Sequence, residues 1–397
     1  MTQASAADVI VVGGGIMGAA TAFFLRQRGV SVILLERDLV GQAASGTNFG
    51  NVRRQGRFLP QLPLAHRSRA IWGDLPGLIG EDAEFLPSGH LRIAFRAEDA
   101  GRLETYAHEA RDWGLELELL SANALRARFP FVAADAVMAS YAPEDGHANP
   151  RLAAPAFARA ARRAGADLRE GVEVLGIAKG SDDFVVETTA GNFRAPVVQV
   201  SAGAWGRAMA AAFGEDVPLV PRGPQMGVTE PVAYRIGPVM GVSSSVAEEG
   251  VYLRQVKRGN IVFGGGVRST ASLETKRARL DPMSTLRQLP QLRRLLPAIA
   301  GLSVIRTWSG VEGYLEDDLP IMGASARVPG LFYAFGFCGH GFQLGPGVGA
   351  TMAELIATGA PGVPIDPFHI GRFAGTVTPA VPPDAMQDST AEGAGFR

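Results

Sequence analysis

The sequence predicts an α/β fold joined to antiparallel β structure, with a Rossmann-like unit at its N-terminus. Three observations predict it: a glycine-rich turn between a strand and a helix near residue 13, alternating apolar patterns in the middle of the chain, and a second strand, glycine-rich loop and helix over 331–359. Apolar runs followed by helices are typical of a buried parallel sheet, whereas strict alternation is typical of an antiparallel sheet with one solvated face. Because the two patterns alternate along 397 residues, two domains are expected.

The first element, residues 9–29, is an apolar run broken by glycines, "VIVVGGGIMGAATAFFLRQRG". Glycine inside a helix costs about 1 kcal/mol against alanine, and a membrane-spanning helix needs about 20 predominantly apolar residues. An export signal also needs positive charge ahead of its apolar stretch, and residues 1–8 contain no Lys or Arg. The run is therefore interpreted as a buried strand, a turn and a helix that ends at Gly29, followed by a second strand over 30–35.

The turn between this strand and helix carries the spacing Gly13-x-Gly15-x-x-Gly18. Such glycines permit a tight turn, a close approach of backbone to a pyrophosphate, and close packing of the helix on the strand. Glu36 ends the second strand at the distance expected for a ribose-binding acid, about 20 residues further on. Together these features predict dinucleotide binding, with a solvated strand-end carboxylate as the alternative for Glu36.

The composition is that of an ordinary globular protein, with a net charge of −1. So small a charge produces no global field toward nucleic acid or anionic lipid. The single cysteine, Cys338, excludes an intrachain disulfide framework and a four-cysteine cluster, fits a reducing, cytoplasmic setting, and is expected to be a small buried residue. Residues 374–397 are polar and Pro-rich without an apolar period, so a disordered tail is expected there.

A second unit begins after the first strand and helix. Residues 40–57, "VGQAASGTNFGNVRRQGR", are expected to form a loop, and loops of this length inside a compact domain are usually functional. A helix is expected over 62–75, a strand over 89–95 from its alternation, and a helix over 97–114 that ends at a glycine.

The remainder of the chain again mixes both kinds of pattern. Asn149 is expected to cap a helix over 149–166, because its side chain can accept hydrogen bonds from the first turn. Strand-like runs follow between 172 and 205, and residues 217–266 are rich in strand patterns that end in a hairpin. Residues 331–359 then return to a strand, a glycine-rich loop and a helix.

Together these pieces resemble the D-amino-acid-oxidase-like flavoproteins, in particular the glycine oxidase and sarcosine oxidase β-subunit branch. Six segments in the family's order carry the resemblance: "VIVVGGGIMGAATAFFLRQRG", "GQAASGTNFGNVRRQ", "PEDGHANP", "VVQVSAGAW", "DLPIMG" and "FGFCGHGFQLGPGVG". The resemblance implies a Rossmann-like FAD-binding domain interleaved with a substrate domain built on an antiparallel sheet. The expected FAD-binding domain takes residues 1–80, 146–216 and 309–373, and the expected substrate domain takes residues 81–145 and 217–308.

The resemblance also implies which residues surround the FAD. The implied set is Gly13, Gly15, Ile16, Met17 and Gly18 at the phosphates, Glu36 and Arg37 at the ribose, Val174, Gly203 and Trp205 at the adenine end, and Ala44, Ser45, Gly50, Asn51, Gly323, Phe337, Gly339, Gly341 and Phe342 along the ribityl chain and flavin. Part of the family attaches its flavin covalently through a cysteine. Because residues 309–323 contain no cysteine, the FAD is expected to be non-covalent.

The implied activity is oxidation of the C–N bond of an amino acid or secondary amine. A hydride leaves the carbon beside the nitrogen for flavin N5, water hydrolyses the imine, and oxygen or another acceptor takes the electrons. Two alternatives stay open: the chain as the β-subunit of a heteromeric sarcosine- or opine-type oxidase or dehydrogenase, and a nicotinamide-dependent reductase. The second glycine-rich loop, residues 336–349, argues against the nicotinamide alternative.

The side chains expected near the substrate depart from the family. Glu312 stands where glycine-oxidase-like members carry an arginine for the substrate carboxylate, and Gln343 stands where sarcosine oxidases carry a lysine. Arg53 is therefore the first candidate for binding that carboxylate, against a solvated arginine, and Arg254 is the second. Glu312 is either a partner for a cationic amine or a structural carboxylate. His340, between two glycines, either orients the substrate or positions the backbone.

The two exchanges remove cations that bind carboxylates and stabilise charge during oxygen reduction. The sequence therefore leads us to expect dehydrogenase character and a substrate that is a secondary amine or N-substituted amino acid. No metal site is expected.

Overall fold

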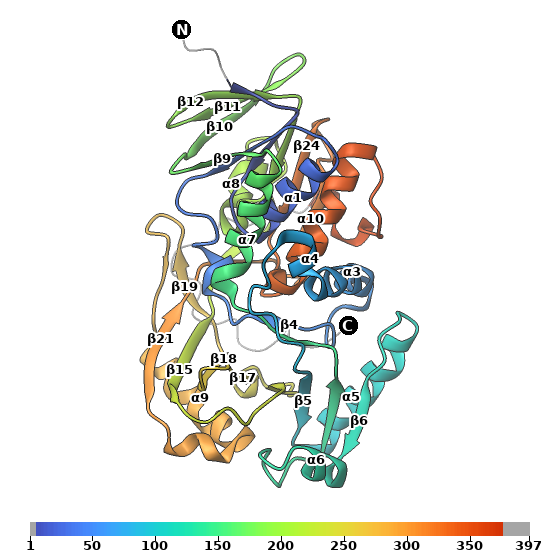
Figure 1. Cartoon of the computed structure of the whole chain (residues 1–397), viewed down its shortest axis with the longest axis vertical. Helices are drawn as coiled ribbons and strands as arrows, with labels where there is room; N and C mark the ends of the chain where they lie inside the picture. Colours follow the sequence, from blue (N-terminus) through green and yellow to red (C-terminus); the bar gives the residue numbers. More distant parts are fainter. Residues whose placement is uncertain (1–4, 376–397) are drawn as a thin grey trace.

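Two large β-sheets organise the computed structural model, which describes residues 5–375 (Figure 1). The six-stranded sheet has the order β23-β24-β13-β2-β3-β9, and the eight-stranded sheet has the order β21-β15-β18-β17-β16-β5-β7-β6. The strands of the first are β2 (Val9–Val12), β3 (Val32–Glu36), β9 (Asp167–Glu170), β13 (Val197–Val200), β23 (Ile321–Ala324) and β24 (Leu331–Phe335). Those of the second are β5 (His90–Ala94), β6 (Glu118–Ser121), β7 (Met138–Ala142), β15 (Gln225–Pro231), β16 (Val239–Val242), β17 (Val251–Gln255), β18 (Asn260–Gly265) and β21 (Val304–Ser309).

The six-stranded sheet is parallel except for its edge strand β23. Its strands are apolar throughout because both faces are covered. Along β2, Val9 and Val11 belong to one core, whereas Ile10 and Val12 belong to a second core on the opposite face. The predicted βαβ unit is confirmed, and Gly29 ends its helix with a φ of +78°.

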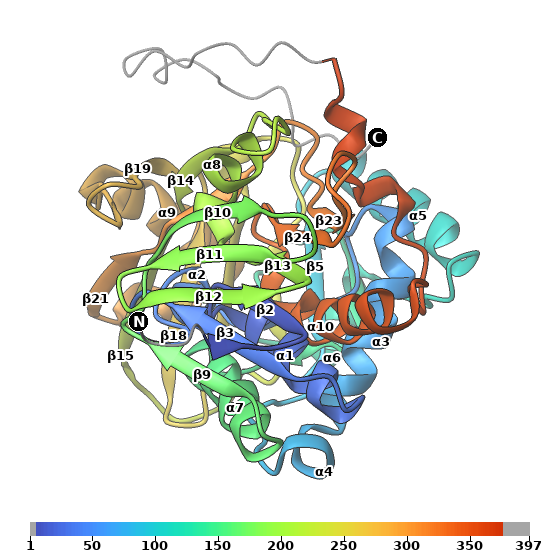
Figure 2. The ribbon, with the colours of Figure 1, turned by 90° about the horizontal axis from the view of Figure 1, so that it is seen from above.

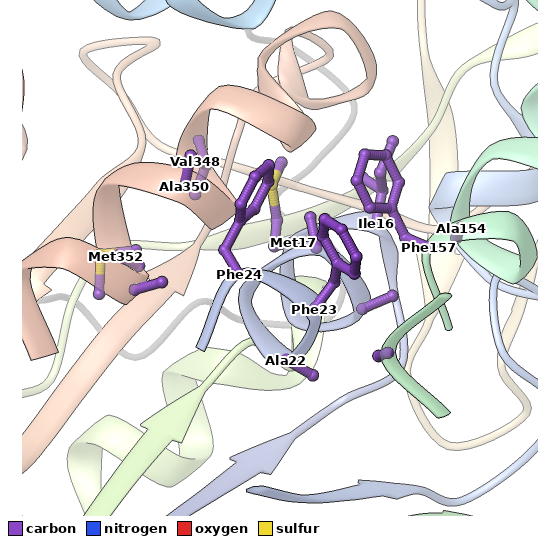
Figure 3. Packing of buried hydrophobic residues seen from close by; sticks show 14 of the residues in the cluster. Ile16, Met17, Ala22, Phe23, Phe24, Ala154, Phe157, Val348, Ala350 and Met352 are labelled. Carbon is purple, nitrogen blue, oxygen red and sulfur yellow. The ribbon is translucent and has the colours of Figure 1, made fainter. Parts of the chain in front are cut away.

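Helices cover one face of this sheet, with α1 at their centre. Figure 3 shows α1 between two other helices, with Phe23 and Phe24 packed near Phe157 of α7 and with Val348 and Met352 of α10 on the other side. In Figure 2, α1, α10 and α3 lie side by side. The α-helices are α1 (Ile16–Gln27), α2 (Ala44–Thr47), α3 (Leu62–Gly73), α4 (Leu75–Ile79), α5 (Ala97–Arg111), α6 (Ala122–Arg128), α7 (Pro150–Arg163), α8 (Gly206–Ala211), α9 (Pro282–Leu295) and α10 (Gly341–Thr358).

Most of the expected elements are confirmed. Asn149 caps α7, since its Oδ1 accepts the Arg151 N–H at 3.1 Å. The hairpin expected within 217–266 is β17 and β18, which pair antiparallel. Short 3₁₀ helices connect the larger elements at Leu59–Gln61, Gly203–Trp205, Ala247–Glu249, Pro297–Gly301, Asp366–Phe368 and Ile370–Phe373.

Three small sheets complete the fold of residues 5–375. The sheet of β10, β11 and β12 lies at one end of the molecule in Figure 1 and packs Phe184, Val186 and Phe193 onto the second core. The small-sheet strands are β1 (Ser5–Ala6), β10 (Val174–Lys179), β11 (Phe184–Thr188) and β12 (Gly191–Ala195); β14 (Val220–Gly223), β19 (Ser269–Ser272), β20 (Arg277–Ala278) and β22 (Glu312–Tyr314); and β4 (Asn51–Val52) and β8 (Gly146–His147).

The eight-stranded sheet is antiparallel except where β5 pairs with β16, which is parallel. These two strands come from the separate segments 81–145 and 217–308, so the parallel pair joins the two halves of the expected substrate domain. Likewise β14 and β22 pair across the boundary at 308. The domain division drawn from the sequence stays our proposal, with the two large sheets as the centres of the two domains.

The loop expected over 40–57 contains two short elements, α2 and β4. Each is too short to give a periodic signal, and each depends on distant partners: β4 on β8, and α2 on α1 through the Ser45 hydroxyl. The tail expected at 374–397 lies outside the described residues apart from its first two. Within residues 5–375, none of the helices has the length and apolarity that a membrane crossing requires.

Candidate active site

A cavity of about 1030 Å³ opens at the carboxyl ends of the six-stranded sheet. The chain runs from β2 outward through β3 and β9, then returns to the other side of β2 as β13 and β24. The carboxyl ends of strands at such a reversal form a crevice in which α/β proteins bind ligands. Residues from β15 and β17 of the other large sheet, Met226 and Tyr252, also line the cavity, which therefore lies between the two sheets.

The structure brings most of the expected site residues together on this cavity. Gly18, Gly323 and Arg254 do not line it. The expected residues that do are Gly13, Gly15, Ile16, Met17, Glu36, Arg37, Ala44, Ser45, Gly50, Asn51, Arg53, Val174, Gly203, Trp205, Glu312, Phe337, Gly339, His340, Gly341, Phe342 and Gln343.

The turn between β2 and α1 is fixed by two close backbone approaches. Gly13 has a φ of +103°, and a Cβ there would lie 2.5 Å from the Ser201 carbonyl oxygen of the strand-end segment after β13. A Cβ on Gly18 would lie 2.0 Å from the Gly13 carbonyl oxygen, so Gly18 permits the helix to pack on the turn from outside the cavity. The N-terminus of α1, with no acidic residue in its first turn, therefore faces the cavity and favours an anion there.

Glu36 is held at the cavity edge by backbone. Its Oε2 accepts the Gly14 N–H at 2.6 Å and its Oε1 accepts the Asp38 N–H at 2.8 Å. Beside it, the Arg37 guanidinium stacks on the Trp205 ring at 3.9 Å. Because an ionised carboxylate accepts up to about four hydrogen bonds, Glu36 retains capacity for hydroxyl donors in the cavity.

The start of α10 is fixed against α3. The Ser68 hydroxyl donates to the Gln343 carbonyl at 2.5 Å and accepts the Gly347 N–H at 3.0 Å, so it replaces one rung of the helix ladder. The Gln343 side chain is buried, and its Nε2 donates to the Ala65 carbonyl at 2.9 Å. Gln343 is therefore a neutral, oriented amide on the cavity wall.

Arg254 lies behind the wall. Its Nε donates to the Phe49 carbonyl at 2.7 Å, and its guanidinium lies 3.1 Å from Nδ1 of His147. Burial is the first cause that lowers the pKa of Arg254, to about 10. These contacts make Arg254 a support for the 49–50 loop, whereas Arg53 reaches the cavity. Gly323 lies on β23 near His369 and Ile365.

Two arginines of the basic cluster line the cavity. Nη1 of Arg53 donates to the carbonyl oxygens of Gln55 and Gly56, the latter at 3.0 Å. Arg57 is only 2% exposed, and its Nε donates to the Arg53 carbonyl at 3.0 Å. Arg57 was not among the residues expected at the site. Its only sequence signal is its place in a basic run, "RRQGR", that has no acidic residue beside it.

An acidic and aromatic group faces the cavity from β22. The Tyr314 hydroxyl donates to Oε2 of Glu312 at 2.8 Å, and the guanidinium of Arg268 lies 4.2 Å from the centroid of the Tyr314 ring. Burial raises the pKa of Glu312. Burial, followed by the charge of Glu312, raises the pKa of Tyr252 to about 12. Sequence reasoning missed Arg268, Tyr252 and Tyr314, which come from separate strands and connecting segments.

His340 precedes α10 and lines the same cavity. Burial holds its pKa well below the usual range, and the charges of Arg57, Arg53 and Arg268 act in the same direction. The imidazole is therefore neutral near pH 7, and it can donate or accept a hydrogen bond without adding a charge.

The residues around the cavity fit FAD. The turn at Gly13 and Gly15 leaves room beside a helix N-terminus for a pyrophosphate. At the other end, Oδ1 of Asn51, Nδ1 of His340 and Oε1 of Gln343 are buried without a hydrogen-bond partner in the described chain. Buried polar atoms are normally paired, so these three indicate a polar ligand at this end of the cavity.

Glu36→Ala is expected to lower FAD affinity by roughly 10- to 150-fold, because a hydrogen bond to a charged group is worth about 1.5–3 kcal/mol. Loss of the Gly14 contact acts in the same direction, since it loosens the turn. Titration of the apoprotein with FAD measures the change.

The matched control is Glu170→Ala, which removes a carboxylate from the neighbouring strand. Glu170 pairs in register with Glu36 but does not line the cavity. Unchanged FAD affinity in Glu36→Ala would return Glu36 to the role of a solvated strand-end carboxylate.

Known proteins resemble this chain over nearly its whole length. The model of the family "FAD dependent oxidoreductase", DAO, matches residues 8–355. Glycine oxidase of Geobacillus kaustophilus is 31% identical over 379 residues, which cover 93% of this chain and 98% of that protein. Sarcosine oxidase subunit beta of an Arthrobacter species is 27% identical over 375 residues, covering 92% and 91%. The crystal structure of L-proline dehydrogenase from P. horikoshii has a TM-score of 0.87 at 25% identity, covering 94% of this chain and 98% of that one.

Proposed function

This chain belongs to the FAD dependent oxidoreductase family and is an FAD-dependent enzyme that oxidises the C–N bond of an amine or amino acid, and we propose that its substrate is a secondary amine with a carboxylate. The resemblance inferred from the sequence is thereby confirmed. One observation carries the proposal: the cavity is lined both by the guanidinium of Arg53, which has no carboxylate partner among residues 5–375, and by the carboxylate of Glu312. Such a pair matches the opposite charges of an amino acid.

FAD held by the turn at Gly13 and Gly15 and by Glu36 would supply the hydride acceptor for oxidation of the C–N bond, and water would hydrolyse the imine product. The chain's residues bind and orient the substrate. Arg53 holds the carboxylate, while Glu312, whose orientation is set by the Tyr314 hydroxyl, faces the amine. The substrate ammonium must lose a proton before its carbon can release a hydride, and Glu312, whose pKa is raised by burial, is placed to accept that proton.

Similarity to relatives supports a secondary amine. Sarcosine and proline, which appear in the names of two of the similar proteins, are secondary amines that also carry a carboxylate. We also propose that the FAD is non-covalent, because residues 309–323 contain no cysteine and burial raises the pKa of the Cys338 thiol to about 12. The same free cysteine supports a reducing, cytoplasmic setting.

The enzyme is further proposed to prefer an acceptor other than oxygen. Gln343 offers a neutral amide, held by the Ala65 carbonyl, at the position where the resemblance leads us to expect a lysine. The test reduces the flavin anaerobically with sarcosine, then compares reoxidation by air with reoxidation by a quinone or dye.

We expect reduction by sarcosine or N-alkylated amino acids, followed by slow reoxidation in air. The guanidinium groups of Arg53 and Arg57 could take over the role of the lysine and stabilise the negative charge that develops during oxygen reduction. In that case air reoxidation is fast and hydrogen peroxide forms stoichiometrically. That result would overturn the dehydrogenase assignment. Rapid turnover of free glycine would overturn the choice of a secondary amine.

A second candidate role is the β-subunit of a heteromeric oxidase or dehydrogenase. The Arthrobacter sarcosine oxidase subunit beta supports it, because this chain covers 91% of that subunit. Recovery of full turnover with an artificial acceptor by the purified chain alone would argue against obligatory partner subunits.

A further inference from the structure

The substrate end of the cavity has an excess of positive charge. Arg53, Arg57 and Arg268 line it, together with Glu312, whose carboxylate lies near enough to Arg268 to be affected by its charge. The charge of Asp145 acts on Arg53 and Arg57 from a distance, while its oxygens accept the Arg54 Nε–H at 2.9 Å and the Arg54 backbone N–H at 2.7 Å.

Neither Arg53 nor Arg57 has a carboxylate oxygen within 4.0 Å among residues 5–375. One carboxylate on the substrate would compensate one of these two cations. The second cation then remains buried without a carboxylate partner, which is costly.

The cost falls more on Arg57 than on Arg53, because Arg57 is only 2% exposed to solvent. Its Nε is used by the Arg53 carbonyl, whereas its Nη1 is buried without a hydrogen-bond partner in the described chain. Burial, followed by the Arg53 charge, lowers the pKa of Arg57 to about 9. Buried guanidinium groups of this kind are typically found against a carboxylate or phosphate, with which their parallel N–H groups form paired hydrogen bonds.

We infer that Arg57 binds a second carboxylate of the substrate, so the preferred substrate is a secondary amine that carries two carboxylates. The inference rests on the proposed function, with Arg53 at the first carboxylate and Glu312 at the amine. The two carboxylates compensate Arg53 and Arg57, so Glu312 remains available for the amine, while Arg268 lies against the Tyr314 ring. The substrate class is then an N-substituted amino dicarboxylic acid or an amine that joins two carboxylate-bearing groups.

A binding experiment tests the inference without turnover. Thiodiacetate and (methylthio)acetate have sulfur in place of the amine nitrogen, and they differ by one carboxylate. We expect the holoenzyme to bind thiodiacetate about 10- to 100-fold more tightly, as measured by flavin absorbance changes and by thermal stabilisation. In Arg57→Gln this advantage is lost, and in Arg57→Lys part of it remains.

Arg258→Gln is the matched control. Arg258 is exposed on the turn between β17 and β18 and does not line the cavity, so its removal is expected to leave the preference for thiodiacetate unchanged. Because the readout is a ratio between two ligands on one protein sample, a partly misfolded variant does not imitate the effect.

Turnover separates this inference from the proposed function. Two pairs are compared: iminodiacetate with sarcosine, and N-methylglutamate with N-methylglutamine. We expect the dicarboxylate to have the higher kcat/KM in at least one pair, and Arg57→Gln to remove that difference. Sarcosine could be oxidised as fast as iminodiacetate, and N-methylglutamine as fast as N-methylglutamate, with no binding preference for thiodiacetate. That result would overturn the inference of a second carboxylate and leave the proposed function intact.

The remaining outcomes are also decisive. Flavin that none of the four amines reduces would overturn the proposed function itself. Equal weakening of both sulfur ligands in Arg57→Gln, with a fall in FAD affinity, would overturn the inference and assign Arg57 to the cofactor.

Discussion

Gly18→Ala is expected to abolish FAD retention and to lower the stability of the protein. The added Cβ would lie 2.0 Å from the Gly13 carbonyl oxygen and 3.1 Å from Cγ1 of Val11, distances at which backbone must move. The helix cannot move away, because α1 is enclosed by α7 and α10 (Figure 3). Overpacking of a buried element costs about 1–3 kcal/mol, and displacement of the turn removes the backbone geometry that faces the pyrophosphate. FAD content after purification and the unfolding temperature measure both effects.

Two further alanine variants separate the effect of helix packing from the effect on the FAD-binding turn. Gly101 in α5 has no atom within 4 Å of a built Cβ, so Gly101→Ala is expected to leave stability unchanged or raise it by up to about 1 kcal/mol. At Gly15 the nearest atom is Oγ of Ser45, at 3.2 Å, so Gly15→Ala is expected to keep the fold and weaken FAD alone. A Gly18→Ala protein that retains FAD and melts with the wild type would contradict the packing role of Gly18.

The cofactor end of the site could be predicted from sequence because its determinants are local. Gly13, Gly18 and Glu36 belong to one βαβ unit, in which strand, turn and helix fix their relative positions. The six-stranded sheet was predictable for the same reason, since apolar runs buried on both faces leave a clear signal. The parallel pairing of β5 with β16 was not predictable, because it joins segments more than a hundred residues apart and no local pattern specifies it.

The substrate end depends on such distant pairings. Tyr314 and Glu312 lie on β22, which pairs with β14 in a small sheet, whereas Tyr252 lies on β17 of the eight-stranded sheet. Their convergence with Arg57 follows from the packing of two sheets and leaves no periodic trace in the sequence. The prediction that Arg254 is a substrate residue came from its alternation with Tyr252 on one strand, yet the 49–50 loop separates its guanidinium from the cavity.

Arg53→Lys is expected to lower kcat/KM for the amine substrate by roughly 10- to 150-fold while the FAD content stays normal. The guanidinium of Arg53 is fixed on the turn, since Nη1 donates to the Gln55 and Gly56 carbonyl oxygens. Its remaining N–H groups can therefore meet a carboxylate without loss of those bonds. Lysine keeps the charge but has one nitrogen, which must serve either the turn or the substrate. The expected loss corresponds to one charge-assisted hydrogen bond of about 1.5–3 kcal/mol.

The division between kcat and KM tells what the contact does. A rise in KM with unchanged kcat means that Arg53 binds ground state and transition state equally, whereas a fall in kcat means that it orients the C–H bond for transfer. We expect both to change, because the carboxylate fixes the carbon that loses hydride.

Arg254→Lys provides the comparison that makes the Arg53 result specific. Arg254 holds the Phe49 carbonyl and contacts His147 from behind the cavity wall, so its replacement acts on the loop rather than on the substrate. We expect Arg254→Lys to lower the unfolding temperature and the FAD affinity while kcat/KM of the FAD-loaded fraction changes little. The reverse pattern, with kcat/KM lost in Arg254→Lys and retained in Arg53→Lys, would move carboxylate binding to Arg254. It would also remove the basis for assigning Arg57 a second carboxylate, because that assignment requires Arg53 to hold the first.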